Sequence, residues 1–279
     1  MLNNKKKIGI IGFGNMGKTI AEGIKSRYTV YVFDIDKNKT LNAAGLQVAQ
    51  SIQDLAKNVD TLILAVKPQD FDMVLNEIKD YAKDILIISI AAGMTAGYIE
   101  KYLGTVRVVR TMPNMPARIG QGLSCLCKGE YATKKDLDFA KKIFGRLGRT
   151  LILKEGMMDA ATAISGSGPG YYFDIVESRA EEYKKKHNKV LKEFIVSLAE
   201  AAENMGFNHK EAIVLAKATG EGSDSLIAET KLAPVELKKQ ITSKGGTTEA
   251  GLEVFHKTGS LTEAARAALI RARELSKKG

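Results

Sequence analysis

Three glycines close to the N-terminus form the first group of residues that could do chemistry. They follow the apolar residues 8–11 and precede a helical pattern. Between a strand and a helix, this spacing is typical of a loop that binds the pyrophosphate of a dinucleotide. Free N–H groups at the helix start would contribute to the same site. We therefore expect a dinucleotide cofactor to bind at Gly12, Phe13, Gly14, Asn15, Met16 and Gly17.

An acidic residue, Asp34, follows a second apolar run at residues 28–33. A carboxylate at the end of the second strand can accept hydrogen bonds from the adenosine ribose diol, which favours NAD over NADP. Lys37 and Lys39 follow at once and could offset the repulsion of a 2′-phosphate. The alternative is that Asp34 only caps the next turn. The sequence predicts Asp34 as a cofactor-binding residue and leaves both NADP and NAD open.

Two loops at the ends of later strand patterns carry further candidates. Cofactor contacts are also expected where the pattern at 61–66 ends, at Ala65, Val66, Lys67 and Pro68. Lys67 could reach a cofactor phosphate or ribose, although it could equally be a solvated loop lysine. In the loop at 111–116, two prolines flank Asn114, so its amide either meets a ligand or belongs to a rigid turn.

A glycine turn far downstream, at residues 243–248, opens a helical pattern. Backbone N–H groups at such a turn form a nest that fits a carboxylate or a phosphate. An ordinary N-cap made by Thr247 or Thr248, with Glu249 in the first turn, explains the same residues. Another glycine-rich stretch, at 164–171, permits either close backbone approach to a ligand or a simple hinge.

The elements that must position these residues fall into two groups. Strand patterns at 7–11, 29–33, 61–66, 85–90, 107–111, 122–127 and 150–153 alternate with helical patterns at 17–26, 69–82, 95–102 and 134–147. This alternation is typical of a parallel, doubly wound sheet. We expect an α/β protein with a Rossmann-type NAD(P)-binding domain at residues 1–155.

Helical patterns dominate the rest of the chain. One or two helices are expected at 171–205, and others at 210–229, 234–240, 248–257 and 261–277. Such helices bury their second apolar face most simply against another copy of the chain. We therefore expect residues 156–279 to form an all-helical dimerisation and substrate domain.

The composition of the 279-residue chain is ordinary for a globular protein, with 44% hydrophobic and 27% charged residues. Its net charge of +10 comes from 42 Lys and Arg against 32 Asp and Glu, yet the lysines are dispersed and aromatic residues are scarce. We therefore favour a solvated basic surface over a nucleic-acid partner. A positive surface would also attract anionic cofactors and carboxylate substrates.

We predict the cellular compartment of the protein from its apolar segments, its N-terminus and its cysteines. No apolar stretch is long enough to span a bilayer, and no signal peptide is recognisable, so we expect no membrane partner. Cys125 and Cys127 have no second pair to complete a metal site. We expect reduced structural thiols, no metal and a cytoplasmic protein.

Taken together, these motifs resemble those of the pyrroline-5-carboxylate reductase family, from about residue 6 to residue 277. The matching motifs are Gly12-Phe13-Gly14-Asn15-Met16-Gly17, Val66-Lys67-Pro68, Met112-Pro113-Asn114-Met115-Pro116, Ser165-Gly166-Ser167-Gly168-Pro169 and Ser243-Lys244-Gly245-Gly246-Thr247-Thr248. The last two are specific to the family, whereas the first is shared by many reductases. The resemblance implies NADPH- or NADH-dependent reduction of a cyclic imine carboxylate, 1-pyrroline-5-carboxylate, to L-proline. It also implies a homodimer with interlocking helices, often within a larger oligomer.

The resemblance also assigns roles to residues. Thr248 takes the family position that contacts the ring nitrogen, so it is the expected catalytic residue. The expected substrate-binding residues are Asn114, Ser243, Gly245, Gly246, Thr247 and Thr248, and the glycine turn would hold the substrate carboxylate. None of the three histidines, His187, His209 and His256, lies in a matched motif.

The chain departs from the family pattern in three features. Lys244 stands where proline is usual, and Gly170 stands where alanine is usual. The segment at 171–206 is longer than usual and contains the polar run 181–189. The extra length would either extend or break the dimerisation helix.

Two other functions fit parts of the pattern. A 3-hydroxyacid dehydrogenase of the same two-domain plan typically has a catalytic lysine about one turn after the interdomain glycines, but residues 171–174 contain none. A non-catalytic NAD(P)-binding regulator or nucleic-acid-binding protein would fit the charge. Either of these would leave the glycine turn at 243–248 without a purpose.

Overall fold

The computed structural model describes residues 5–276, which divide by their internal packing into two compact units. Unit 1 comprises the described residues up to Thr111 together with Leu126–Arg146, and unit 2 comprises Met112–Cys125 and the described residues from Leu147. This division differs from the expected boundary at residue 155, because 112–125 and 147–155 pack with the helical part. The outer ends of the predicted domains 1–155 and 156–279, and of the helix predicted at 261–277, lie outside the described residues.

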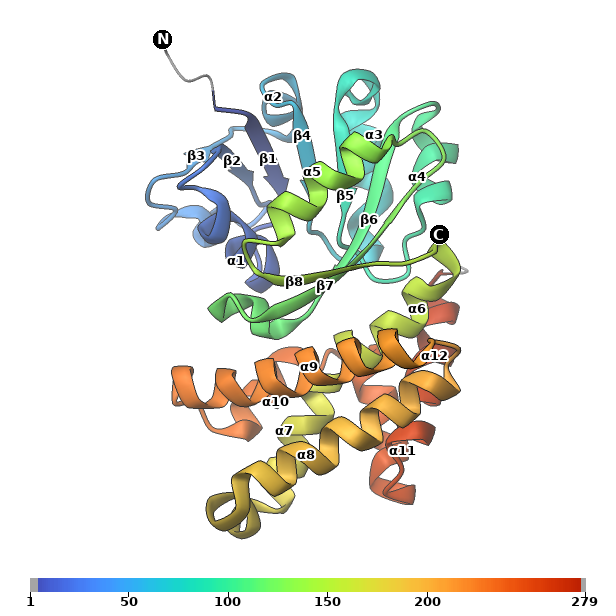
Figure 1. The fold of residues 1–279 in the computed structure, drawn as a ribbon. Coiled ribbons are helices and arrows are strands. Elements are labelled where there is room, and N and C mark those ends of the chain that lie inside the picture. Colours follow the sequence, from blue (N-terminus) through green and yellow to red (C-terminus); the bar gives the residue numbers. More distant parts are fainter. Residues whose placement is uncertain (1–4, 277–279) are drawn as a thin grey trace. The chain divides into compact units, whose positions relative to one another are not determined.

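An open sheet with the strand order β3-β2-β1-β4-β5-β6-β7-β8 dominates the first half of the chain (Figure 1). Its strands are β1 (Lys7–Ile11), β2 (Thr29–Phe33), β3 (Gln47–Val48), β4 (Thr61–Leu64), β5 (Leu86–Ser89), β6 (Arg107–Pro113), β7 (Gly122–Lys128) and β8 (Gly148–Ile152). Pairing is parallel from β3 through β6, and Ile8 of β1 stands opposite both Val30 and Thr61. The strand order reverses between β1 and β4, and ligands bind at such a switch point.

The chain turns back between β6 and β7. Only residues 114–121 connect these neighbouring strands, which is too short for a parallel crossover. The N–H of Gly129, just after β7, donates to the carbonyl of Val108 near the start of β6 at 2.8 Å. The prediction of a parallel sheet is thus confirmed from β3 to β6, and β7 runs antiparallel to β6.

The helices of unit 1 are α1 (Asn15–Ile24), α2 (Ile52–Lys57), α3 (Phe71–Ile78), α4 (Ala96–Leu103) and α5 (Lys134–Phe144). The hydroxyls of Ser51, Thr95 and Thr133 cap α2, α4 and α5 by accepting the N–H three residues on. The pattern predicted at 69–82 forms α3 between two 3-10 turns. Strand β3 and helix α2 were not predicted, because two and six residues are too few to show a clear period.

Unit 2 is largely helical and contains α6 (Met158–Ala161), α7 (Gly168–Ser178), α8 (Ala180–Asn204), α9 (His209–Thr230), α10 (Pro234–Ile241), α11 (Thr247–Thr258) and α12 (Leu261–Ser276). A π-helical turn, Thr162–Gly166, precedes α7. Tyr171, Tyr172 and Phe173 are consecutive and fully buried, so the start of α7 is covered on all sides. Within residues 5–276, no helix is both long and apolar enough to cross a membrane.

The lengthened segment at 171–206 breaks the helix instead of extending it. Helix α7 ends at Ser178, and Arg179 leaves the helical region with φ −113° and ψ 32°. A second bend lies inside α8, where Lys186 has φ −139° and ψ 45°. The polar run is therefore largely helical, and the bends at Arg179 and Lys186 turn the chain there.

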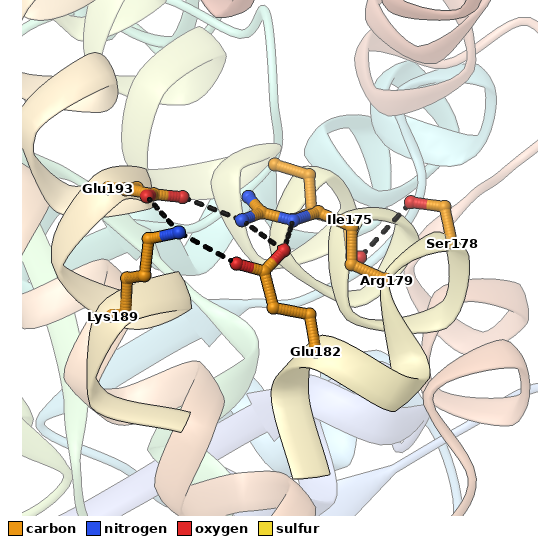
Figure 2. A network of polar contacts seen from close by, with 6 residues as sticks. All are labelled: Ile175, Ser178, Arg179, Glu182, Lys189 and Glu193. Atoms are coloured by element: carbon orange, nitrogen blue, oxygen red, sulfur yellow. Dashed lines mark hydrogen bonds and ion pairs between the residues drawn. The ribbon is translucent and has the colours of Figure 1, made fainter. Parts of the chain in front are cut away.

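Side-chain charges hold this turn (Figure 2). The Arg179 guanidinium contacts Glu182 and Glu193, each at 2.7 Å. The Lys189 ammonium joins the same two carboxylates at 3.0 and 3.6 Å. Because these side chains are about a third to a half exposed, the network orders the turn while adding little to stability.

A buried carboxylate ties α5 to the sheet of unit 1. Asp136 is 7% exposed and accepts hydrogen bonds from the Thr133 N–H (2.8 Å), the Thr133 hydroxyl (2.6 Å) and Arg107 Nη1 (2.8 Å). Burial acts to raise the pKa of Asp136, but the Thr133 hydrogen bonds and the Arg107 charge outweigh it and lower the pKa. The ionised group therefore stabilises the fold at neutral pH, and this contribution is lost as the pH falls through the lowered pKa.

We expect Asp136→Asn to lower the free energy of unfolding by about 1–2 kcal/mol at neutral pH, because the amide cannot replace the ion pair. The deficit should shrink at acidic pH, where the wild-type carboxyl is also protonated. Chemical denaturation near pH 7 and near pH 3 measures both values. Asp138→Asn removes an exposed charge from the same helix and serves as the control. An equal deficit at both pH values would contradict the role of the charge.

Candidate functional site

The first candidate site lies at the switch point of the sheet in unit 1. Gly12 has φ +95°, and its N–H donates to the Phe33 carbonyl at 2.8 Å. A Cβ at Gly12 would lie 2.5 Å from the backbone oxygen of Ala65, after β4. Only glycine therefore fits where the chain leaves β1, as the motif predicts.

The other two glycines of the motif have different surroundings. A Cβ at Gly17 would overlap the carbonyl oxygen of Gly12, so Gly17 allows α1 to pack against the turn. Gly14 has open space where its Cβ would be, with no atom within 4 Å. It begins α1 without a side-chain cap, and the first helical bond runs from Lys18 N to Gly14 O at 2.9 Å. The N–H groups of Asn15, Met16 and Gly17 precede that bond and are available to an anion.

Asp34 lies beside this turn and is 8% exposed. Its carboxylate accepts hydrogen bonds from Phe13 N (2.7 Å), Asp36 N (2.9 Å) and Lys39 Nζ (3.1 and 3.3 Å). Burial acts to raise the pKa of Asp34, but the two backbone N–H groups and the Lys39 ammonium outweigh it and lower the pKa. Asp34 therefore caps the glycine turn as an anion while Lys39 places a cation beside it.

A pocket of about 310 Å³ opens next to Asp34. Its walls bring together six of the predicted cofactor residues, namely Gly12, Gly14, Asp34, Ala65, Val66 and Lys67. The other five, Phe13, Asn15, Met16, Gly17 and Pro68, do not line it. The pocket also includes Ile35 and Met73, which were not predicted although Ile35 is 78% exposed. An exposed isoleucine directly after a buried strand is a signal that could have identified this wall.

The second candidate site lies in unit 2, at the start of α11. Gly245 has φ +69°, and Gly246 begins the helix without a side-chain cap. The first helical bond runs from Ala250 N to Gly246 O at 3.2 Å. The N–H groups of Thr247, Thr248 and Glu249 precede that bond and have no carbonyl within the helix to reach. These three N–H groups are the part of the predicted anion nest that has no acceptor within the helix.

The two glycine N–H groups of the turn already have acceptors. Gly245 N donates to Glu249 Oε2 at 2.6 Å, and Gly246 N donates to the carbonyl of Ser243 at 2.9 Å. Arg271 Nε donates to the carbonyl of Gly245 at 2.7 Å. For Ser243, Gly245 and Gly246 the geometry supports a role in shaping the turn, so the donors left for a substrate are the N–H groups of the helix start.

Buried hydroxyls support the helix start from behind. The Ser167 hydroxyl, which is fully buried, donates to Thr247 Oγ1 at 3.0 Å. Thr248 is 5% exposed, and its methyl group fills the space that a Cβ at Gly170 would need, 2.5 Å away. The usual alanine at residue 170 would therefore displace this methyl group.

Asn114 lies in a buried network of unit 2. Its Nδ2 donates to Ser165 Oγ at 3.2 Å, and its Oδ1 accepts from Leu123 N at 2.8 Å. The Thr219 hydroxyl reaches the same Ser165 oxygen at 3.3 Å. Asn114 is 2% exposed, so this geometry favours the rigid turn, and its contact with substrate stays a prediction.

Sequence reasoning missed three buried polar residues of unit 2: Ser167, which contacts the second site, and Ser165 and Thr219, which bond to each other beside Asn114. Ser165 and Ser167 lie in the glycine-rich stretch, whose alternating serines could have suggested them. Thr219 lies in the middle of α9, where no local signal sets it apart.

Cys125 and Cys127 are buried and outside any disulfide, and burial raises the pKa of the Cys125 thiol to about 12. This thiol is therefore inert at neutral pH. No group of His, Cys, Asp and Glu suited to a metal ion occurs among residues 5–276.

Comparison with known proteins identifies relatives of both halves of the chain. Residues 7–93 match the family described as NADP oxidoreductase, coenzyme F420-dependent, and residues 190–278 match pyrroline-5-carboxylate reductase dimerisation. The chain is 35% identical to pyrroline-5-carboxylate reductase from Methanosarcina acetivorans, over 98% of this chain and 97% of that protein. The enzyme structure from Coxiella burnetii is similar (33% identity, TM-score 0.63, 98% and 99% covered). The structure of the enzyme from Plasmodium falciparum with NADP bound is also similar, with 29% identity and a TM-score of 0.62, over 99% of this chain and 100% of that chain. The chain belongs to the pyrroline-5-carboxylate reductase family.

Proposed function

We propose that this protein reduces 1-pyrroline-5-carboxylate to L-proline with NAD(P)H, the last step of proline biosynthesis. Relatives that align over nearly the whole chain support this reaction. The structural observation that carries the proposal is the start of α11, where the N–H groups of Thr247 and Thr248 have no side-chain cap and Thr248 also carries a hydroxyl. The substrate has a matching pair of groups, because its carboxylate is attached to the carbon next to the ring nitrogen.

The pocket in unit 1 fits a dinucleotide, because Gly14 leaves open the space where a phosphate must approach the backbone. The N–H groups at the start of α1 would hold the pyrophosphate. When bound, NAD(P)H supplies the hydride that reduces the imine carbon. Asp34 suits the ribose diol of NADH, whereas Lys39 beside it offers a cation to the 2′-phosphate of NADPH.

Residues of unit 2 would bind the substrate and deliver the proton that its ring nitrogen gains. The N–H groups of Thr247 and Thr248 would hold the carboxylate through charge-assisted hydrogen bonds and so fix the ring. The Ser167 hydroxyl keeps Thr247 in place. Reduction adds one proton to the ring nitrogen, and Thr248 Oγ1 would hold or relay that proton. Since a protonated imine is already electrophilic, positioning contributes more than acid strength.

We also propose that the protein forms a homodimer or a larger homo-oligomer and works in the cytoplasm. The match of residues 190–278 to a dimerisation family supports the assembly. Exposed apolar side chains on α8 and α9, at Val196, Ile213 and Val214, offer surface for it. Two buried cysteines outside any disulfide are typical of a reducing compartment.

Oxidation of NADPH and NADH, followed by absorbance, tests the proposed reaction. We expect oxidation with 1-pyrroline-5-carboxylate, formation of L-proline, and no oxidation with a 3-keto acid control. Faster oxidation with the keto acid would favour a 3-hydroxyacid dehydrogenase. Salt-sensitive DNA binding without reductase turnover would favour the regulator.

Two glycine variants separate cofactor binding from folding. Gly14→Ala places a methyl group in the open space of the turn, so we expect the NAD(P)H Kd to rise about tenfold or more while thermal stability changes little. Gly17→Ala should instead lower the Tm, because its methyl group overlaps the Gly12 carbonyl. Gly97→Ala, in equally open space on α4, is the control for Kd. Unchanged cofactor binding by Gly14→Ala would disprove the pyrophosphate assignment.

The role of the Thr248 hydroxyl predicts a specific kinetic defect. Thr248→Ala should lower kcat on the order of 10- to 100-fold with NAD(P)H affinity nearly unchanged, because it removes the hydroxyl that relays the proton and positions the substrate, together with a methyl group that Thr248→Ser also removes. Thr248→Ser keeps the hydroxyl and should retain most of the turnover. Steady-state kinetics and a cofactor titration measure both effects, and wild-type turnover by Thr248→Ala would rule out this role.

A further inference from the structure

A carboxylate of the protein already bonds to the turn that precedes α11, within a few residues of the N–H groups proposed to hold the substrate carboxylate. Glu249 Oε2 accepts the N–H of Gly245 at 2.6 Å. On its other side, Gly245 is held through its carbonyl by Arg271 Nε at 2.7 Å. Two charged side chains, from α11 and α12, therefore fix a residue with positive φ and keep the turn in shape.

The negative charge of Glu249 is not neutralised by an ion pair. Arg271 is paired with Glu274 at 2.8 Å, and no ion pair joins Glu249 to a cation anywhere in residues 5–276. Lys244 is the neighbouring cation in the turn, and it is exposed. The partial positive charge of the helix start is what favours a carboxylate at this point, from the protein or from a ligand.

We propose that Glu249 is a built-in competitor of the substrate carboxylate and limits the affinity of the site for imines that carry one. This inference rests on the proposed function, which places the substrate carboxylate at the N–H groups of Thr247 and Thr248. These donors and Gly245 N lie within the same turn, so two carboxylates there repel each other. Glu249 keeps the turn ordered when the site is empty, and its charge weakens binding when the substrate arrives.

The proposal makes a distinction between substrates. The repulsion acts only on an imine that has a carboxylate, such as 1-pyrroline-5-carboxylate. The parent ring 1-pyrroline has no such group and would meet no penalty. Glu249 therefore sets the preference of the site between charged and uncharged cyclic imines.

Glu249→Gln tests the charge separately from the hydrogen bond, because its amide oxygen can still accept the N–H of Gly245. We expect the KM for 1-pyrroline-5-carboxylate to fall about threefold to tenfold, as for removal of one partly exposed like charge, while kcat stays within about twofold. The KM for 1-pyrroline should not change. Glu253→Gln removes an exposed charge one turn further along α11 and should leave both KM values unchanged.

An unchanged or increased KM for 1-pyrroline-5-carboxylate in Glu249→Gln would overturn the proposal and leave Glu249 as a helix cap. A fall that Glu253→Gln reproduces would also overturn it, because general surface charge would then explain the effect. If Glu249→Gln folds poorly, Glu249→Ala should still lower the KM for the carboxylate substrate relative to that for 1-pyrroline. A wild-type protein that reduces no imine contradicts the proposed function itself, whereas an active wild type with insensitive variants contradicts only the role of Glu249.

Discussion

Backbone N–H groups that no helical carbonyl can reach are the feature on which both candidate sites depend. The N-cap residues of helices α1 and α11 are glycines, Gly14 and Gly246, which have no side chain to accept hydrogen bonds from those N–H groups. By contrast, α2, α4 and α5 begin at Ser or Thr residues whose hydroxyls do accept them. A helix that starts without its own acceptor has donors to offer, and we propose that the start of α1 binds a pyrophosphate and the start of α11 a small carboxylate.

The rest of each site holds these donors in place from the side away from the ligand. In unit 1, the carboxylate of Asp34 accepts Phe13 N and so fixes the glycine turn. In unit 2, Ser167 holds Thr247, and the buried amide of Asn114 ties two loops together through Ser165. These contacts require several polar groups to be buried, and each of these groups makes a hydrogen bond. Support of this kind fixes a site to the accuracy that catalysis needs.

Much of the fold follows from local patterns in the sequence. The bounds of β1 and β2 and the glycine motif were predicted correctly, because hydrophobic runs and turn residues act over a few neighbours. The capping role of Asp34 was one of two open alternatives, and only the structure shows its three donors, Phe13 N, Asp36 N and Lys39 Nζ. The bond from Gly245 to Glu249 and the burial of Asn114 were not predicted, since they depend on turn geometry and on contacts between distant residues. Sequence reasoning thus located the candidate sites and missed which donors remain free.

The most direct test of the account is a crystal structure of the protein with L-proline and the oxidised cofactor bound. The account predicts that the proline carboxylate accepts the N–H groups of Thr247 and Thr248, with the ring nitrogen at the Thr248 hydroxyl. It also predicts that the cofactor pyrophosphate lies over Gly14. A proline carboxylate held elsewhere, away from the N–H groups of Thr247 and Thr248, would contradict the central claim that this helix start selects the substrate.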